Sequence, residues 1–581
     1  MAYSRLQKLA SYIRPHWKQA LLGIFALLVV NALGVYIPLL IRNGINDLEI
    51  AIDLTPIIGL VFLILGLASL MWVIRMASRI LLFGVGRQVE FDLKQNIFEH
   101  LLTLEPAYFS NSRIGDLINR ATSDVDNIRR LLGFAILSLA NTVFAYALTL
   151  PVMLTINVKL TLLSISVYPL MLILVQVFSD RMRDEQMHVQ EKLSNISDLI
   201  QEDMSGISLI KIYAQEENEQ RAFERYNQEL FSANLSLART RNILFPVLGG
   251  LASLSLLILL AVGDKSIAQG ELNVGDFVAL VLYIERLVFP TALLGFTITA
   301  YQRGEVSIDR IEAIVSVKPK IHDHLDPIPL STPVKGWLTA RDLSYSYPGE
   351  KTPALDRVNF TIKPGEMVAI VGPIGSGKST LANALPRLLD IEIDSIFLDG
   401  QDITQLQLFE LRNAIAYVPQ ESFLFSTTIR ENIRYGNPLA DASEIETAAK
   451  TAQIYGEILN FPQQYDTIVG ERGITLSGGQ RQRTALARAL LVDAPVLILD
   501  DALSSVDNQT ATEILQNLTT GKQRKTVVFI SHQMSAAAKA NRILVMDQGQ
   551  IVQEGNHEQL VQQKGLYQSL WNQHQLEELL I

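Results

Sequence analysis

Six long apolar runs in the first 300 residues constrain this chain more than any other feature of its sequence. They lie at about residues 19–41, 56–74, 131–156, 160–178, 243–263 and 277–300, and the first is interrupted only by Gln19 and Asn31. A run of about 20 apolar residues is long enough to cross a bilayer as a helix, and it exceeds the apolar core of a signal peptide. The sequence therefore predicts six membrane-spanning helices.

Basic residues between the runs orient the predicted membrane domain, because Lys and Arg stay on the cytoplasmic side of a bilayer. The segment between the second and third runs is flanked or filled by Arg75, Arg79, Arg87, Lys94, Arg113, Arg120, Arg129 and Arg130. The first connection, residues 42–55, has Arg42 against three acidic residues. We therefore expect a multi-pass protein of a bacterial plasma (inner) membrane, with its N-terminus in the cytoplasm and long helical segments there at about 75–130 and 179–242.

Two charged residues fall inside the sixth run. Glu285 and Arg286 lie about 14 Å from the outer start of that run at the helical rise of ~1.5 Å per residue, near the middle of the bilayer. Intramembrane charges face either a water-filled cavity or a fixed partner on a neighbouring helix. Both interpretations stay open, but adjacent residues cannot share one helix face.

The remainder of the chain has a different composition. Hydrophobic residues make up 49% of the whole chain, concentrated before residue 300, and the net charge of −10 gives no sign of a nucleic-acid partner. The chain has no cysteine, which excludes disulfides and thiolate metal sites. A polar, proline-broken stretch follows the last run, and strands then alternate with helices. We expect a transmembrane domain at 1–316, a linker at 317–334 and an α/β domain at 335–581.

A glycine-rich motif near the start of the α/β domain predicts nucleotide binding. Residues 372–380 read G-x-x-x-x-G-K-[ST], after the apolar strand Met367–Val371 and before the expected helix at 381–389. The glycines let backbone N–H groups surround phosphates, Lys378 supplies a point charge, and Ser379 offers its hydroxyl to Mg²⁺. The alternative is a glycine turn without a ligand. The residues expected to hold the phosphates are Gly372, Gly375, Gly377, Lys378, Ser379 and Thr380.

Other polar residues follow apolar strands further along the domain. The strand 495–500 ends in Asp500, a carboxylate placed to hold Mg²⁺, and Asp501 could polarise an attacking water. Gln420 and His532 leave strand ends, where ligand groups of open α/β sheets gather. Each of them alone would more often be a surface residue. A second glycine turn, residues 476–480, precedes a helix and offers a further place for phosphate.

These motifs together resemble a known family. The P-loop, Gln420, the signature Leu476-Ser-Gly-Gly-Gln480, the strand ending in Asp500, residues 504–507 and His532 stand in the order of an ABC-transporter ATPase. With six spans and the stretches 115–124 and 206–216, the chain resembles a type IV ABC exporter half-transporter over essentially its whole length. The implied fold is a six-helix all-α transmembrane domain followed by an α/β P-loop ABC ATPase domain.

The resemblance implies roles for individual residues. Tyr347 would stack on the adenine of ATP, Ser379, Gln420 and Asp500 would hold Mg²⁺, and His532 would contact the γ-phosphate. The signature residues Ser477, Gly479 and Gln480 would complete the site of an opposite subunit, because such ATPases bind two nucleotides between two domains. Glu471 would lie in the loop that senses the membrane domain, and coupling helices would lie near 113–118 and 204–212.

One position departs from the family pattern. Asp501 stands where most of these ATPases have a glutamate as catalytic base. Its side chain is one methylene shorter, and a misplacement of about 1 Å can cost on the order of 10²-fold in rate. We therefore expect a slow site and favour a heterodimer with a second half-transporter over a homodimer.

The resemblance implies ATP-driven export of an amphipathic small molecule, lipid or peptide across the plasma membrane by one half of a dimeric exporter, with membrane lipid around it. The alternative is a degenerate regulatory subunit that completes a partner's ATPase site with little turnover of its own. An importer is disfavoured, because importers usually carry the two domains on separate chains.

Overall fold

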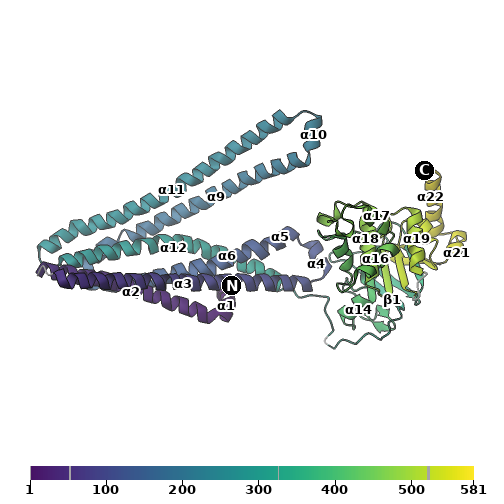
Figure 1. The fold of residues 1–581 in the computed structure, drawn as a ribbon, viewed down its shortest axis with the longest axis horizontal. Coiled ribbons are helices and arrows are strands. Elements are labelled where there is room, and N and C mark those ends of the chain that lie inside the picture. The colour runs from purple at the N-terminus through teal and green to yellow at the C-terminus, as the bar shows by residue number, and fades with distance from the viewer. Residues whose placement is uncertain (1, 51–53, 325, 520–523, 581) are drawn as a thin grey trace. The chain divides into compact units, whose positions relative to one another are not determined.

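The computed structural model describes residues 2–50, 54–324, 326–519 and 524–580. The chain divides into two compact units (Figure 1). The first comprises Met1–Leu102 and Arg113–Val317, and the second comprises Thr103–Ser112 and Lys318–Ile581. The second unit therefore includes a short helix, α4 (Pro106–Asn111), that lies far earlier in the sequence than the rest of that unit.

The first unit is built of helices. Among the described residues, six helical stretches are long and apolar enough to cross a membrane, which confirms the predicted architecture: Gln7–Leu48, Ile57–Thr103, Ile114–Ile156, Val158–Ser205, Glu216–Ala268 and Val274–Val315. Its elements are α1 (Ala2–Ile13), η1 (Arg14–His16), α2 (Trp17–Ile50), α3 (Leu54–Thr103), α5 (Ile114–Asn119), η2 (Arg120–Asp124), α6 (Val125–Arg130), η3 (Leu131–Ala135), α7 (Ile136–Ile156), α8 (Val158–Ile165), α9 (Tyr168–Ser205), α10 (Ile207–Ile212), α11 (Glu216–Ala268) and α12 (Val274–Val315).

Large apolar side chains lie on the outside of this unit. Phe62 and Trp72 on α3 are 71% and 66% exposed. Water would disfavour such a surface, whereas a helix of this length fits the hydrocarbon of a bilayer. The interior packs Met153, Leu244 and Leu280 from α7, α11 and α12 into one buried cluster.

Several helices continue beyond their apolar runs as polar extensions. Helices α9 and α11 run side by side to the short connecting helix α10 (Figure 1). Glu185 on α9 accepts a hydrogen bond of 2.9 Å from the Thr240 hydroxyl on α11, and Lys192 lies 2.9 Å from Glu229. These polar contacts join the two helices in a stretch where Val189 and Ile196 of α9 are also buried.

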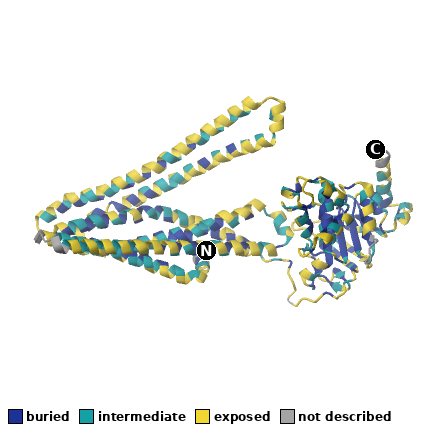
Figure 2. Cartoon of the chain, viewed as in Figure 1, coloured by how far each residue is buried: buried dark blue, intermediate teal, exposed yellow. Residues whose placement is uncertain are grey.

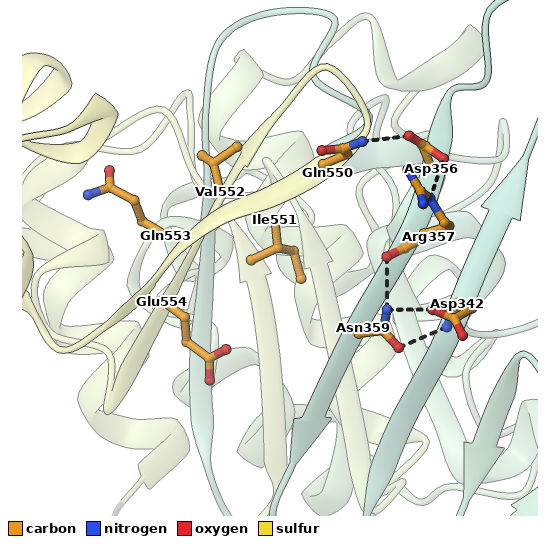
Figure 3. A pocket seen from close by; sticks show the side chains of 9 residues that line it. All are labelled: Asp342, Asp356, Arg357, Asn359, Gln550, Ile551, Val552, Gln553 and Glu554. Atoms are coloured by element: carbon orange, nitrogen blue, oxygen red, sulfur yellow. Dashed lines mark hydrogen bonds and ion pairs between the residues drawn. The ribbon is translucent and has the colours of Figure 1, made fainter.

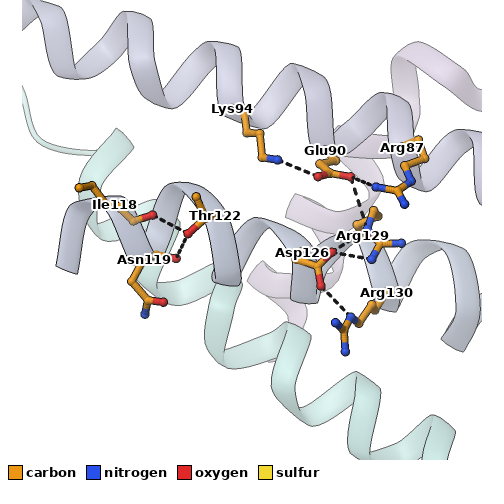
Figure 4. A network of polar contacts seen from close by, with 9 residues as sticks. All are labelled: Arg87, Glu90, Lys94, Ile118, Asn119, Thr122, Asp126, Arg129 and Arg130. Carbon is orange, nitrogen blue, oxygen red and sulfur yellow. Dashed lines mark hydrogen bonds and ion pairs between the residues drawn. The ribbon is translucent and has the colours of Figure 1, made fainter. Parts of the chain in front are cut away.

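A charged network ties α3 to α6 in the same way (Figure 4). Glu90 on α3 accepts hydrogen bonds from Lys94 at 2.7 Å and Arg87 at 2.9 Å, and it pairs with Arg129 of α6 at 3.4 Å. Asp126 accepts a hydrogen bond from the same Arg129 at 2.8 Å. The hydrogen bond from Lys94 is the main reason that the pKa of Glu90 lies below its usual value.

The second unit is an α/β domain, as predicted. In its described part the strands form an antiparallel sheet in the order β2-β1-β4-β5 and a larger sheet in the order β10-β9-β3-β8-β7-β6, in which β9, β3, β8, β7 and β6 are parallel. The strands are β1 (Leu338–Tyr345), β2 (Leu355–Ile362), β3 (Met367–Val371), β4 (Ile396–Leu398), β5 (Gln401–Asp402), β6 (Ile415–Val418), β7 (Val496–Asp500), β8 (Thr526–Ile530), β9 (Arg542–Asp547) and β10 (Gln550–Gly555).

Helices cover the larger sheet, and its central strands β3, β8 and β7 are buried, whereas the antiparallel edge strand β10 is not (Figure 2). Successive residues of a strand point to opposite faces, so Ala369 and Ile370 of β3 enter two different apolar clusters. The helices of this unit, besides α4, are α13 (Lys378–Ala384), α14 (Leu408–Ala414), α15 (Ile429–Arg434), α16 (Ala442–Thr451), α17 (Tyr455–Asn460), η4 (Gln464–Asp466), η5 (Glu471–Gly473), α18 (Gly478–Leu491), α19 (Asn508–Thr519), α20 (Met534–Ala537), α21 (His557–Gln562) and α22 (Leu566–Leu580).

The helix after the P-loop is shorter than the sequence suggested. The expected helix reached residue 389, but α13 ends at Ala384. Pro386 follows two residues later, and a proline has no N–H to donate to the helix. Arg387 then adopts a positive φ of 53°, which turns the chain away from the helix axis.

Candidate nucleotide site

The P-loop connects β3 to α13 through backbone conformations that favour glycine. Gly375 and Gly377 have φ angles of 82° and 96°. A Cβ added at Gly377 would lie 2.4 Å from the carbonyl oxygen of Ala354, and one at Gly372 would lie 2.1 Å from that of Met546. Two of these glycines are thus required by close backbone contacts as well as by the turn.

Lys378, the first residue of α13, lies against this loop. Its Nζ donates hydrogen bonds to the carbonyl oxygens of Gly372 at 2.9 Å and Pro373 at 2.7 Å. Burial lowers the pKa of Lys378, whereas the nearby charges of Asp501 and Asp500 raise it. An ammonium held at the loop by carbonyl oxygens is positioned to bind a phosphate that enters the loop.

Asp500 ends β7 beside the P-loop, and both of its carboxylate oxygens accept hydrogen bonds. The Ser379 hydroxyl donates to Oδ1 at 2.9 Å, and the Tyr417 hydroxyl lies 3.3 Å from Oδ2. Burial raises the pKa of Asp500, and these two hydrogen bonds oppose the increase. One hydroxyl and one carboxylate match the oxygen ligands that Mg²⁺ takes from protein when phosphates and water supply the others.

Asp501 is also buried, and it adopts a left-handed backbone conformation with φ of 50°. Its carbonyl oxygen accepts a hydrogen bond from the Ser504 hydroxyl at 2.9 Å, and its N–H donates to Ile530 at 3.1 Å. Burial raises the pKa of Asp501, and the charge and backbone N–H of His532 lower it. The structure therefore brings Asp501 and His532 together at the ends of β7 and β8.

Tyr347 and Gln420 lie at the border of this region. The Tyr347 hydroxyl is 3.3 Å from the Thr380 hydroxyl, and its ring is 39% exposed with one edge against Tyr345. An exposed ring at this position could stack on a base. Gln420 is exposed and follows the end of β6 by two residues.

The signature residues form a separate cluster. Ser477 caps α18, because its N–H donates to Gln480 at 2.9 Å and its hydroxyl accepts from the Gln480 N–H at 3.3 Å. Gly479 packs against the Ser505 backbone, where an added Cβ would lie 2.7 Å from the carbonyl oxygen. Within the described ranges, no hydrogen bond or ion pair joins Ser477, Gly479 or Gln480 to the P-loop.

Tyr417 is a site residue that the sequence analysis missed. It stood in the apolar strand 416–419, yet its hydroxyl lies 2.9 Å from Asn383 Oδ1 as well as 3.3 Å from Asp500. The available signal was a polar hydroxyl three residues before Gln420, in a strand that pairs with the one ending in Asp500.

The two intramembrane charges separate in the structure. Arg286 donates to the carbonyl oxygen of Asn31 at 3.1 Å and to its side-chain oxygen at 3.0 Å. Glu285 lines a cavity of about 470 Å³ between α11 and α12. Arg286 therefore has a fixed partner, and Glu285 faces open space.

A polar hollow on the second unit contains none of the predicted site residues (Figure 3). It lies between β2 and β10, and its side chains bond one another: Asn359 donates to Asp342 at 2.8 Å. We assign no function to it.

Two regions of the chain, which together make up most of its length, match known protein families. Residues 20–291 match the family described as ABC transporter transmembrane region. Residues 355–504 match the family described as ABC transporter.

Individual relatives match along nearly the entire length. The multidrug resistance-like ATP-binding protein MdlA of Escherichia coli is 34% identical over 99% of this chain and 97% of its own. The ATP-dependent lipid A-core flippase of Desulfotalea psychrophila is 33% identical over 98% of this chain and 99% of its own. The solved structure of a bacterial Atm1-family ABC exporter with ATP bound has a TM-score of 0.78 and 26% identity, and the match covers 96% of this chain and 99% of that one.

Proposed function

The chain belongs to the ABC transporter family as an exporter half-transporter, and we propose that it forms one half of a dimer that exports an amphipathic small molecule, lipid or peptide across the plasma membrane. It is a multi-pass membrane protein that couples ATP hydrolysis to transport. One observation carries the proposal: Lys378, Ser379 and Asp500 meet at one edge of a parallel sheet in a chain that also has six candidate spans.

The proposed ATP site uses the P-loop and the ends of the neighbouring strands. Backbone N–H groups of Gly372, Gly375 and Gly377 would surround the phosphates, with Lys378 as the counter-charge and Thr380 beside the ring of Tyr347. The side chains that would hold Mg²⁺ are Ser379, Gln420 and Asp500. When bound, the ion neutralises charge on the phosphate oxygens.

Hydrolysis would depend on Asp501 and His532. The Asp501 carboxylate would accept a proton from the attacking water. His532 would contact the γ-phosphate while the bond between that phosphate and the leaving oxygen breaks. Burial raises the pKa of Asp501, and the charge and backbone N–H of His532 oppose this increase. Because aspartate is one methylene shorter than glutamate, we expect turnover to be slow.

A second subunit would complete the site. Ser477, Gly479 and Gln480 cluster away from this chain's own P-loop, which suits residues that contact a nucleotide held by a partner. Asp501 favours a heterodimer with a second half-transporter over a homodimer. It also supports the alternative function, a regulatory subunit that completes a partner's ATPase site.

We propose that residues 1–316 form the membrane domain, 317–334 the linker and 335–581 the ATPase domain, with the N-terminus and the ATPase domain in the cytoplasm. The distribution of Lys and Arg supports this orientation. Helices α5 (Ile114–Asn119) and α10 (Ile207–Ile212) would be the coupling helices and would pass motion of the ATPase domain to the spans.

The proposal is tested in proteoliposomes with a fluorescent phospholipid analogue as the probe. Purified protein, with and without a second half-transporter from the same cell, should move the probe between leaflets only when ATP is present, and Lys378→Ala should abolish the movement. Movement that is equal with and without ATP in both preparations would reject export.

A further inference from the structure

The first unit contains a cavity of about 660 Å³ between α6, α9, α11 and α12. Each of these helices contributes an arginine to its lining: Arg130, Arg183, Arg241 and Arg303. We call this space the basic cavity. Its other polar lining includes Asn127 and Gln186, and no acidic residue lines it within the described part of the chain.

The arginines are only partly neutralised by neighbouring acids. Arg130 pairs with Asp126 at 2.7 Å, and Arg183 pairs loosely with Asp180 at 3.5 Å. Among residues 2–50, 54–324, 326–519 and 524–580, no acidic side chain forms an ion pair with Arg241 or Arg303. The cavity thus has an excess of positive charge that an anion could balance.

The arginines lie just outside the apolar runs. Arg130 and Arg241 precede runs that begin at about residues 131 and 243, and Arg183 and Arg303 follow runs that end at about 178 and 300. At about 1.5 Å per residue, each is within about 8 Å of the apolar boundary. This is the depth of lipid headgroups, on the side that we propose is cytoplasmic.

Aromatic side chains line the part of the basic cavity that lies within the apolar runs. Phe134 and Phe296 lie within the third and sixth runs, and the cavity touches both. The hydroxyl of Ser179 is buried at the lining and has no hydrogen-bond partner within the described ranges. A buried hydroxyl without a partner has a free donor for a polar ligand atom.

We propose that the basic cavity binds the anionic headgroup of a phosphate-bearing amphiphile, with its hydrocarbon chain along Phe134 and Phe296. The inference rests on the proposed export function, because it names the class of substrate that the transporter would carry. Arg241 and Arg303 line the cavity without an acidic partner in the described part of the chain, so they supply most of the selectivity for negative charge. The cavity beside Glu285 offers a single acidic group, and a cationic ligand is therefore the competing outcome of the test.

The test is equilibrium binding of radiolabelled dodecyl phosphate to the full-length protein in phosphatidylcholine nanodiscs, without nucleotide and with empty nanodiscs subtracted. Dodecyltrimethylammonium and dodecyl maltoside carry the same chain on cationic and neutral headgroups. The double variant Arg241→Gln, Arg303→Gln should weaken dodecyl phosphate binding at least about tenfold, because one charge-assisted hydrogen bond accounts for a factor of that size.

Two variants control for structure. Arg239→Gln removes an exposed arginine on α11 that does not line the basic cavity, and it should leave binding unchanged. Replacement of Arg241 and Arg303 by lysine keeps the charges and should retain binding within about threefold, since a point charge still attracts phosphate. Each variant is compared by its size-exclusion profile.

Equal losses in the double glutamine variant and in Arg239→Gln would overturn the proposal, as would tighter binding of dodecyltrimethylammonium than of dodecyl phosphate. Failure of the export proposal can be told apart from failure of the binding proposal. Lys378→Ala should abolish ATP-driven movement of the phospholipid probe and leave dodecyl phosphate binding intact. Loss of charge selectivity while ATP-driven movement persists would refute the basic cavity alone.

Discussion

Removing the Tyr417 hydroxyl should weaken Mg²⁺ binding at the ATP site, so that hydrolysis needs more Mg²⁺, without disrupting the domain. This hydroxyl carries one hydrogen, which can go to Asn383 Oδ1 at 2.9 Å or to Asp500 Oδ2 at 3.3 Å. The Ser379 hydroxyl would remain on Asp500 Oδ1 in Tyr417→Phe. The variant therefore loses one of two hydrogen bonds that orient the carboxylate proposed to hold Mg²⁺.

The magnitude follows from the geometry. A hydrogen bond to a charged group contributes about 1.5–3 kcal/mol, and one that is long and shared between two acceptors should contribute about 1 kcal/mol. Since 1.4 kcal/mol corresponds to a factor of ten, the Mg²⁺ concentration for half-maximal hydrolysis should rise about fivefold. The rate at saturating Mg²⁺ should change less than about twofold, and the free energy of unfolding should fall by about 1 kcal/mol.

The assay is a Mg²⁺ titration of ATP hydrolysis at fixed ATP. Because the Tyr417 hydrogen bond holds the pKa of Asp500 down against burial, the defect should grow as the pH falls. Tyr435→Phe is the matched control, since that ring is exposed and packs against Phe425 away from Asp500. An unchanged Mg²⁺ dependence in Tyr417→Phe, or a collapse of the saturated rate, would refute the positioning role.

Further predictions concern the P-loop and the network of Figure 4. Gly377→Ala should abolish binding of a fluorescent ATP analogue, because the added Cβ would lie 2.4 Å from a carbonyl oxygen. The Cβ of Gly375→Ala meets open space, so that variant should cost only about 1–2 kcal/mol of backbone strain. Equal binding defects in the two variants would contradict the steric argument. Glu90→Gln should lower the thermal midpoint near neutral pH. The pKa of Glu90 is lowered in the fold, so its stabilisation is present above the unfolded value of about 4.3 and is lost as the pH falls through the folded value. The midpoints of Glu90→Gln and the parent should therefore converge in acid, and a difference that persists there would exclude the charge as its cause.

The six helices and the α/β domain could be predicted because each depends on local sequence: an apolar run, or a strand followed by a glycine turn. Contacts that depend on strand order could not. Tyr417 reaches Asp500 because β6 pairs in parallel with β7, and the two strands are about 80 residues apart in the sequence.

Contacts between helices that are far apart in the sequence could not be predicted either. Arg286 donates to Asn31 across more than 250 residues, and nothing around either residue signals the other. Of the four arginines of the basic cavity, the sequence indicates a role only for Arg130, as a marker of membrane orientation, because the convergence of all four depends on how the helices pack.

This chain should hydrolyse ATP with the help of Lys378, and Asp501 should make its own site slow. The most direct measurement is ATP hydrolysis by the purified chain in lipid, beside Asp501→Glu and Lys378→Ala, with the mass of the assembly determined in parallel. We predict slow hydrolysis that Lys378→Ala abolishes and that Asp501→Glu raises on the order of 10²-fold. A fast parent rate that Asp501→Glu leaves unchanged or lowers, in a dimer of this chain alone, would contradict the claim.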